Sequence, residues 1–179
     1  MAEAFSNKLT RAAGIVTTSS SGAVGIGTTI ITGISTVGVA VSDLVDNTNF
    51  IAGTKVSAIG INTVYADRDS TNTAAASAQI FKFLGMTTAY TSAASTKSVL
   101  IGGTFANNTA NSVNLTVEIH DASAGIQAAL ASKIPVPTGS SFVISDAGKT
   151  VLEKGDEVRV FCDTANAIDV NLSILTGVS

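Results

Sequence analysis

The sequence predicts an all-β protein, and three observations carry this prediction. Apolar and polar residues alternate along several short runs, which is the period of a half-buried strand. Gly and Asn-Thr pairs separate these runs at intervals of roughly ten residues, as between short antiparallel strands. Charged residues are only 13% of the 179 residues, and Thr, Ser, Asn, Gly and Ala take their place; of these, β-branched Thr is well suited to strands.

Residues 1–21, MAEAFSNKLTRAAGIVTTSSS, show no clean helical or strand period. We expect an extended N-terminal arm that either is disordered or lies on a neighbouring molecule. Apolar side chains in this arm have no local partners, and each gains about 1.5–3 kcal/mol if a neighbour buries it. The basic side chains can pair with acids on that neighbour. The candidate interaction residues are Phe5, Lys8, Leu9, Arg11, Ile15 and Val16.

Residues 22–86 are expected to form a small β domain. In the run VGVAVSDLV, Val37, Val39 and Val41 alternate with small residues and predict a half-buried strand. The runs TKVSAIGINTVYADRD and AQIFKFL predict further strands. The Ala-rich stretch 73–79 fits either a turn of helix or a loop.

Residues 87–98, TTAYTSAASTKS, are predicted to be a linker, with a strand entry as the alternative, and residues 99–179 a β-sandwich domain. Three runs of this domain alternate strictly, and strands with one apolar face need a second apolar layer. SVLIGGTFANN and SSFVISD can supply it, so we expect an antiparallel sandwich of the jelly-roll or immunoglobulin-like kind. The alternating apolar positions are Val113, Leu115, Val117 and Ile119, then Val158, Val160 and Cys162, then Ile168, Val170, Leu172 and Ile174.

Charge and hydropathy argue against two classes of partner. The net charge is −3 and the pI about 4.9, so no basic stripe is available for nucleic acid. Residues 12–42 carry no charge, but Gly, Ser and Thr interrupt the stretch and a membrane span is not expected. A secretion signal is not expected either, since Glu3 precedes the basic residues.

With a single cysteine, stability must come from packing or from partner chains.

The segment VLEKGDEVRV, residues 151–160, gathers three acids and two bases. We interpret it as a turn between strands, with Gly155 supplying a positive φ. Glu153, Asp156 and Glu157 are then expected at a hairpin tip in water, where nothing raises a carboxylate pKa for acid–base chemistry.

Other polar groups are also interpreted structurally. His120 is expected on the polar face of its strand, without the nucleophile that catalysis requires. The oxygen-rich stretch 67–72 is expected to be a polar turn, with a weak cation site as the alternative, because it lacks the central Gly and closing Glu of a calcium loop. Cys162 is expected to be a buried core thiol. No catalytic, cofactor-binding or metal-binding residue is therefore predicted.

The C-terminal run IPVPTGSSFVISDAGKTVLEKGDEVRVFCDTANAIDVNLSIL resembles a small β-sandwich module of tailed-bacteriophage virion proteins. FSNKLTR resembles the leader that precedes such modules, and VSDLVDNTNFIAGTKVSAIG is similar to small β inserts of phage tail and fibre proteins. Here residues 22–86 separate the leader from the sandwich. The positions that match the module are Pro135 to Pro137, Gly139-Ser140, Leu152 to Asp156 and Ser173 to Leu175.

The resemblance implies a non-enzymatic structural component of a virion, assembled in the bacterial host cytoplasm without a cofactor. Its place would be capsid decoration or an adaptor at the neck or tail. The implied partners are copies of itself, in a trimer or ring, and capsid, portal or tail proteins. The alternative is a receptor- or carbohydrate-binding module of a phage fibre or a cell surface. Such sites use aromatic platforms, for which this chain offers Tyr65 and Tyr90 but no Trp.

Overall fold

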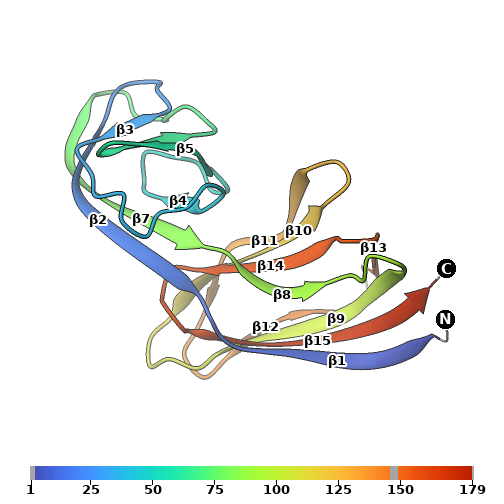
Figure 1. Cartoon of the computed structure of the whole chain (residues 1–179). Coiled ribbons are helices and arrows are strands. Elements are labelled where there is room, and N and C mark those ends of the chain that lie inside the picture. The colour runs from blue at the N-terminus through green and yellow to red at the C-terminus, as the bar shows by residue number, and fades with distance from the viewer. Residues whose placement is uncertain (1–2, 146–148, 179) are drawn as a thin grey trace. The chain divides into compact units, whose positions relative to one another are not determined.

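The computed structural model describes residues 3–145 and 149–178, and this part of the chain contains antiparallel strands and no helix. The all-β prediction is therefore confirmed. The chain divides into two compact units. Unit 1 comprises residues 1–14 and 87–179, and unit 2 comprises residues 15–86, so the chain leaves unit 1 after Gly14 and returns to it at Thr87 (Figure 1).

Unit 1 contains two antiparallel sheets. Sheet A has the strand order β1-β15-β9-β12, and β13 also pairs with β9; sheet C has the order β11-β10-β14-β8. In sheet A the strands are β1 (Ala4–Ala13), β9 (Lys97–Asn107), β12 (Ser141–Ile144), β13 (Thr150–Leu152) and β15 (Ile168–Val178). In sheet C they are β8 (Thr87–Thr91), β10 (Val113–Asp121), β11 (Ile126–Val136) and β14 (Glu157–Cys162).

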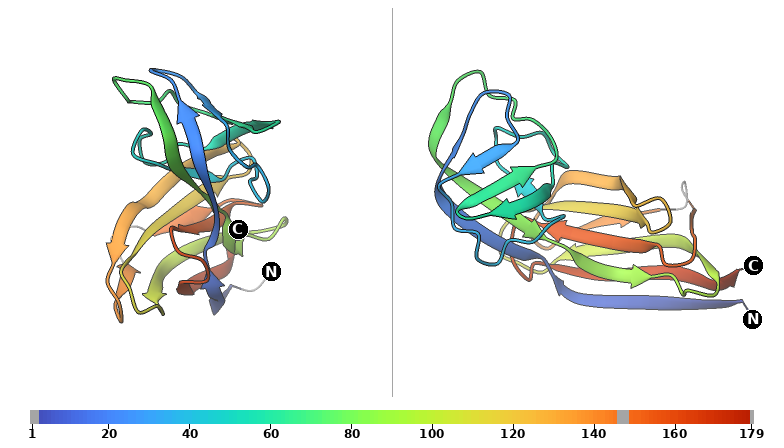
Figure 2. Two further views of the ribbon diagram at one scale, coloured as in Figure 1. Left: turned by 90° about the vertical axis from the view of Figure 1, so that its left-hand side faces the viewer. Right: turned by 45° about the horizontal axis from the view of Figure 1, so that its top comes forward.

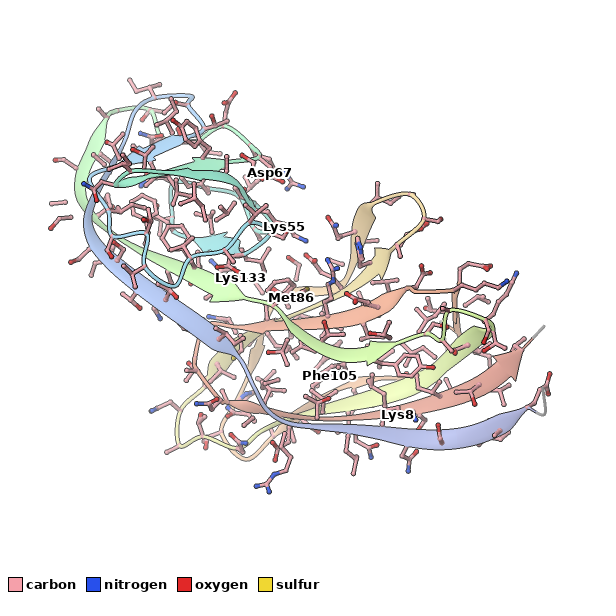
Figure 3. All side chains as sticks on the ribbon, in the orientation of Figure 1. Lys8, Lys55, Asp67, Met86, Phe105 and Lys133 are labelled. Carbon is pink, nitrogen blue, oxygen red and sulfur yellow. The ribbon has the colours of Figure 1, made fainter. Side chains whose placement is uncertain are left out.

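The two sheets of unit 1 share one apolar core. Leu100 and Phe105 of β9 pack in the same cluster as Leu115 of β10 and Val160 of β14, and Figure 3 labels Phe105 in the interior of unit 1. Each strand contributes every second residue, which is why the alternation was visible in the sequence. Cys162 belongs to this cluster, so its predicted burial is confirmed.

The three alternating runs do not share one sheet. Residues 113–121 and 157–162 form β10 and β14 of sheet C, whereas residues 168–178 form β15 of sheet A, between β1 and β9. Periodicity identifies the buried face of a strand, but it carries no information about which strand lies beside it.

Residues 4–13 do not form an unpaired arm. They form β1, which pairs with β15 from Ala4↔Thr176 to Ala13↔Ile168. Residues 15–24 form β2 of unit 2, so the expected arm over 1–21 is divided between the units. The period of β1 was hidden because its core-facing positions are polar: Ser6, Lys8 and Thr10 lie opposite buried residues of β15.

The expected linker is also structured. Residues 87–91 form β8 and residues 97–98 begin β9, so only residues 92–96 connect the strands. Tyr90 of β8 donates or accepts a hydrogen bond with Ser98 at 2.8 Å. The alternative of a strand entry fits the structure, since small polar residues such as Thr suit a short strand at the end of sheet C.

Unit 2 contains one six-stranded antiparallel sheet, sheet B, with the order β4-β7-β2-β3-β6-β5. The two ends of this order meet, because Leu44 bridges Lys55, Val45 N donates to Thr54 O at 2.8 Å and Val56 N donates to Asp43 O at 2.9 Å. The strands are β2 (Ile15–Val24), β3 (Ile30–Thr32), β4 (Leu44–Asp46), β5 (Val56–Gly60), β6 (Thr63–Ala66) and β7 (Ala76–Gly85).

The predicted strand over 37–41 is wrong. Val37 and Val41 are exposed, and this segment consists of tight turns that precede β4. Gly38 has a φ of 82° and Ser42 a φ of 75°, and the Asp43 carboxylate accepts a hydrogen bond from Ala40 N at 2.8 Å. These local bonds compete with strand pairing. In the stretch 73–79, residues 73–75 form a loop and residues 76–79 already belong to β7, so no helical turn is present.

Candidate interaction surface

Strand β1 presents apolar side chains to solvent. Phe5 is 77% exposed and Leu9 is 73% exposed. Both lie on the same face as Asn7 and Arg11, because alternate residues of a strand point to the same side. The opposite face is turned toward the core of unit 1, since Lys8 pairs with the buried Leu172.

The outer face of sheet A, directed away from the core of unit 1, continues this apolar character across neighbouring strands. One cross-strand row runs from Phe5 through Leu175 and Val99 to Val151. A second row runs from Leu9 through Asn171 and Thr104 to Val143. The outer face consists of Phe5, Asn7, Leu9, Arg11, Val99, Ile101, Thr104, Ala106, Val143, Val151, Asp169, Asn171, Ser173 and Leu175.

Charges on this face lie toward its two ends. At one end Lys97 Nζ and Glu153 Oε1 form an ion pair of 3.0 Å. At the other end Asp169 Oδ1 accepts a hydrogen bond of 2.9 Å from Ala12 N, where the register of β1 shifts. Beside it, Leu9 and Arg11 line a shallow hollow of about 320 Å³. The two rows between these ends contain only uncharged side chains.

The backbone edge of β1 is the second feature of this surface. Among the described strands, β1 ends the order of sheet A and pairs only with β15. Alternate residues of such a strand direct N–H and C=O groups away from the sheet, where another strand can pair with them. From Ala4 to Thr10 the pairing has no register shift, so this edge is regular over seven residues.

The other outer strands of unit 1 are short or irregular. β12 and β13 have four and three residues, and β8 has five residues with a bulge at Ala89. β11 is long, but two register shifts interrupt its pairing, Lys133 has a φ of 52° and Pro135 lacks an N–H. Such devices discourage pairing with another chain. Among the described strands of unit 1, β1 offers the longest regular edge.

The structure brings together some, not all, of the six candidate residues. Phe5, Leu9 and Arg11 lie on the outer face of sheet A, and Lys8 lies on the opposite side of the same strand. Ile15 and Val16 belong to β2 of unit 2. Sequence reasoning missed the neighbours Val99, Val143, Val151 and Leu175, because they lie on other strands and no local pattern shows which strands pair. In β9 a bulge at Ile101 also interrupts the alternation.

The 153–156 turn is not a hairpin tip. β13 lies in sheet A and β14 in sheet C, so the turn connects the two sheets. Gly155 has the expected positive φ of 87°. Asp156, however, is buried, and its carboxylate accepts hydrogen bonds from Ala122 N at 3.0 Å and Glu153 N at 2.9 Å. The prediction that Asp156 lies in water is wrong, because the carboxylate holds two loops together.

The remaining polar candidates also have structural partners. His120 Nδ1 lies 3.0 Å from Gln127 Nε2. The pKa of Asp121 is lowered, first by a hydrogen bond from the Ala124 amide and then by the Ser123 hydroxyl. In stretch 67–72, Asp67 Oδ1 accepts a bond of 2.8 Å from Lys55 N; Figure 3 labels Asp67 and Lys55. Within the described residues no cluster of three or more metal-ligating side chains occurs.

Comparisons with known proteins add no relative: no family model, no curated protein and no solved structure matches the chain. Among the described residues no helix is long and apolar enough to cross a membrane. Any functional assignment therefore depends on the surface described above.

Proposed function

We propose that this chain is a non-enzymatic structural component of a tailed-phage virion, acting by subunit assembly as capsid decoration or as an adaptor at the neck or tail. The observation that carries the proposal is the outer face of sheet A. It combines exposed Phe5 and Leu9 with uncharged rows and the regular edge of β1. Soluble chains rarely leave such a combination open unless another molecule covers it.

We assign unit 1 to the β-sandwich class, of jelly-roll or immunoglobulin-like kind. All its strand pairs are antiparallel, and its two sheets enclose one core. Strands that follow one another along the chain change sheets, as β8 and β9, β9 and β10, and β14 and β15 do. This kind of connection is typical of sandwiches. Sandwiches serve many functions, so the class alone does not identify one.

Assembly by this face would repeat weak contacts in a symmetric array. An apolar side chain as exposed as Phe5 contributes about 1.5–3 kcal/mol when a neighbour buries it. Copies arranged in a trimer or ring, or on a capsid, portal or tail protein, multiply that contribution through avidity. Neither a catalytic group nor a cofactor is needed for such a role.

Cross-linking of purified phage particles from cells that make this chain, followed by mass spectrometry, tests the proposal. We expect the chain in the particles, with cross-links between sheet A and either a capsid protein or a portal or tail protein. Absence of the chain from purified particles would overturn the proposal.

A double substitution tests whether the outer face of sheet A mediates assembly. Phe5→Ser and Leu9→Ser together should lower incorporation into particles. Ile61→Ser is the matched control, because Ile61 is 92% exposed in the β5–β6 turn of unit 2. Deletion of residues 4–13 is a poorer test, since it removes a strand of sheet A. Equal incorporation of all variants would contradict the role of this face.

The second candidate, a receptor- or carbohydrate-binding module, has one observation in its favour. In unit 2 Tyr65 is partly exposed and pairs with Ile30, which lines an open hollow of about 410 Å³ together with Thr28 and Thr32. Tyr65 is not among the residues that line the hollow, but aromatic side chains with a few placed polar groups are typical of ligand sites. Specific binding on a glycan array that Tyr65→Ala abolishes would favour this function over ours.

A further inference from the structure

We propose that two copies of this chain pair through antiparallel β1 strands, across a two-fold axis that passes beside Asn7. The inference rests on the proposed function, since it names a second copy as the molecule that covers the edge of sheet A. The outcome is one sheet that continues from β15 and β1 of one copy into β1 and β15 of the other. Figure 2 shows β1 along the border of sheet A, beside β15.

Symmetry restricts the registers. A two-fold axis perpendicular to the sheet keeps the outer face of both copies on the same side. Outer-face residues of one β1 then lie opposite outer-face residues of the other, so odd-numbered residues must face odd-numbered residues. Moving from one permitted register to the next shifts the strands by two residues.

One register matches both the charge and the hydropathy of β1. With Asn7 opposite Asn7 of the second copy, Phe5 lies opposite Leu9 and Glu3 lies opposite Arg11, each pair occurring twice. Phe5, Leu9, Glu3 and Arg11 are all exposed in the single chain and available for these contacts. Opposite charges and apolar pairs in directly opposed positions stabilise antiparallel strands.

The neighbouring registers lose these matches. A shift of two residues in one direction places Phe5 opposite Asn7 and Leu9 opposite Glu3. A shift in the other direction places Phe5 opposite Arg11 and sets Lys8 against its own copy. The charge pattern of β1 therefore selects the register centred on Asn7.

The core-facing side of β1 supplies an independent observation. Ser6 Oγ is buried and has no hydrogen-bond partner within the described part of the chain. In the proposed register Lys8 of the second copy lies directly opposite Ser6. The ammonium group can then donate a hydrogen bond to this hydroxyl, which otherwise remains unsatisfied.

Pairing would also join the apolar rows of the two outer faces. The row Val151, Val99, Leu175 and Phe5 of one copy continues into Leu9 of the other and then through Asn171 and Thr104 to Val143. The extended face is then a larger platform for a capsid, portal or tail protein than either copy offers alone.

Charge-reversal variants in sedimentation equilibrium at low ionic strength test the pairing. Glu3→Arg sets Arg against Arg, and Arg11→Glu sets Glu against Glu, so each variant alone should dimerise at least tenfold more weakly than the unaltered chain. An equimolar mixture of the two variants restores both ion pairs and should form a heterodimer. A double variant carrying both changes should again dimerise by itself.

A cysteine placed at the axis tests the register directly. Asn7→Cys should form a disulfide-linked dimer under mild oxidation, and the native Cys162 is buried and does not compete. Ser173→Cys is the matched control on the same face, one strand further in. Its copy would lie three strand spacings away, about 14 Å, too far for a disulfide.

Three results would overturn the inference: an unaltered chain that stays monomeric up to its solubility limit, a variant mixture that fails to associate, or equal cross-linking of the Asn7 and Ser173 variants. Far-UV circular dichroism establishes that each variant is folded. Absence of the chain from phage particles would remove the proposed function yet leave a measured β1 dimer standing. The two failures are therefore distinguishable.

Discussion

In unit 2 the ends of sheet B are joined by the Leu44–Lys55 bridge, whereas in unit 1 sheet A ends at β1 with one side unpaired. Joining the ends satisfies edge groups within the chain and leaves little for another molecule to pair with. β1 has neither a bulge nor a proline between Ala4 and Thr10. The contrast indicates that a partner would pair with the open edge of β1, because the chain joins the ends of sheet B but leaves this edge of sheet A unpaired.

The cores of the units differ in a related way. Unit 1 buries mostly aliphatic residues between two sheets of long strands. Unit 2 buries Phe50, Phe81 and Phe83, and the ring of Phe81 contacts the other two. Apart from β2 and β7, its strands have only three to five residues and are joined by long connections. Those connections are held by polar groups, such as Ser70 Oγ, which donates to Gly25 O at 2.9 Å. Alternation is therefore a strong signal in unit 1 and a weak one in unit 2.

The largest expected effect comes from removing one core aromatic. Phe81→Ala should destabilise unit 2 by about 3–5 kcal/mol and raise amide hydrogen exchange in β2 and β7. Because Phe81 belongs to a core distinct from that of unit 1, exchange in β10 and β14 should change little. Phe105→Ala is the matched variant: it should raise exchange in β10 and β14 and change exchange in β2 and β7 little. Equal loss of protection in both units after either change would show that they unfold together.

Gly14→Ala should destabilise unit 1 by roughly 2–4 kcal/mol. Gly14 has a φ of 122°, and a Cβ there would lie 2.5 Å from Thr164 O. Gly139→Ala separates the cost of a positive φ from the cost of the close contact. Its φ is 66°, but no atom lies within 4 Å of the added Cβ, so only the backbone cost of about 1 kcal/mol is expected. Chemical denaturation measures both. Equal costs would refute the close approach to Thr164.

Asp156→Ala should cost roughly 1.5–3 kcal/mol, the range for hydrogen bonds to a charged group, because the amides of Ala122 and Glu153 lose their acceptor. Glu153→Ala removes only the exposed ion pair with Lys97 and should cost less than about 1 kcal/mol. Thermal unfolding of the two variants measures the difference. A larger loss for Glu153→Ala would contradict the structural role of Asp156.

Two carboxylates should give the units opposite responses to pH. In unit 1 the pKa of Asp121 is lowered by hydrogen bonds from Ala124 and Ser123, so its stabilising contribution is present above pH 3.8 and is lost as the pH falls through the folded-state pKa. In unit 2 burial raises the pKa of Asp43, against the opposing hydrogen bond from Ala40. Its ionisation disfavours folding at neutral pH, and acidification toward 3.8 relieves this penalty.

Asn substitutions reveal these opposite signs. As the pH falls from neutral, the unaltered chain should gain stability relative to Asp43→Asn, with the change above pH 3.8. Relative to Asp121→Asn it should lose stability, with the change below pH 3.8. Urea denaturation across this range measures both differences. The same sign for both variants would contradict the assigned environments.

The sequence predicted the strands whose partners lie on both sides and whose core-facing residues are apolar, such as Val113–Val117 and Ile168–Ile174. It missed β1, because an edge strand tolerates Lys8 and Ser6 at core-facing positions where solvent is near. It placed a strand at Val37–Val41, because an alternating pattern gives no sign of the positive φ angles that Gly38 and Ser42 adopt. It interpreted Asp156 as solvated, because burial depends on Ala122 and Ser92, which are distant along the chain.

The sequence by itself determined that the chain is all-β, that Cys162 is buried and which face of β10, β14 and β15 enters the core, because these properties follow from composition and a two-residue period. Tertiary structure alone decided that residues 4–13 pair with residues 168–176, that β10 and β15 lie in different sheets and that Phe5 and Leu9 share a surface with Val99 and Val151. Pairing between strands far apart in sequence depends on the packing of the whole chain, and no local pattern encodes it.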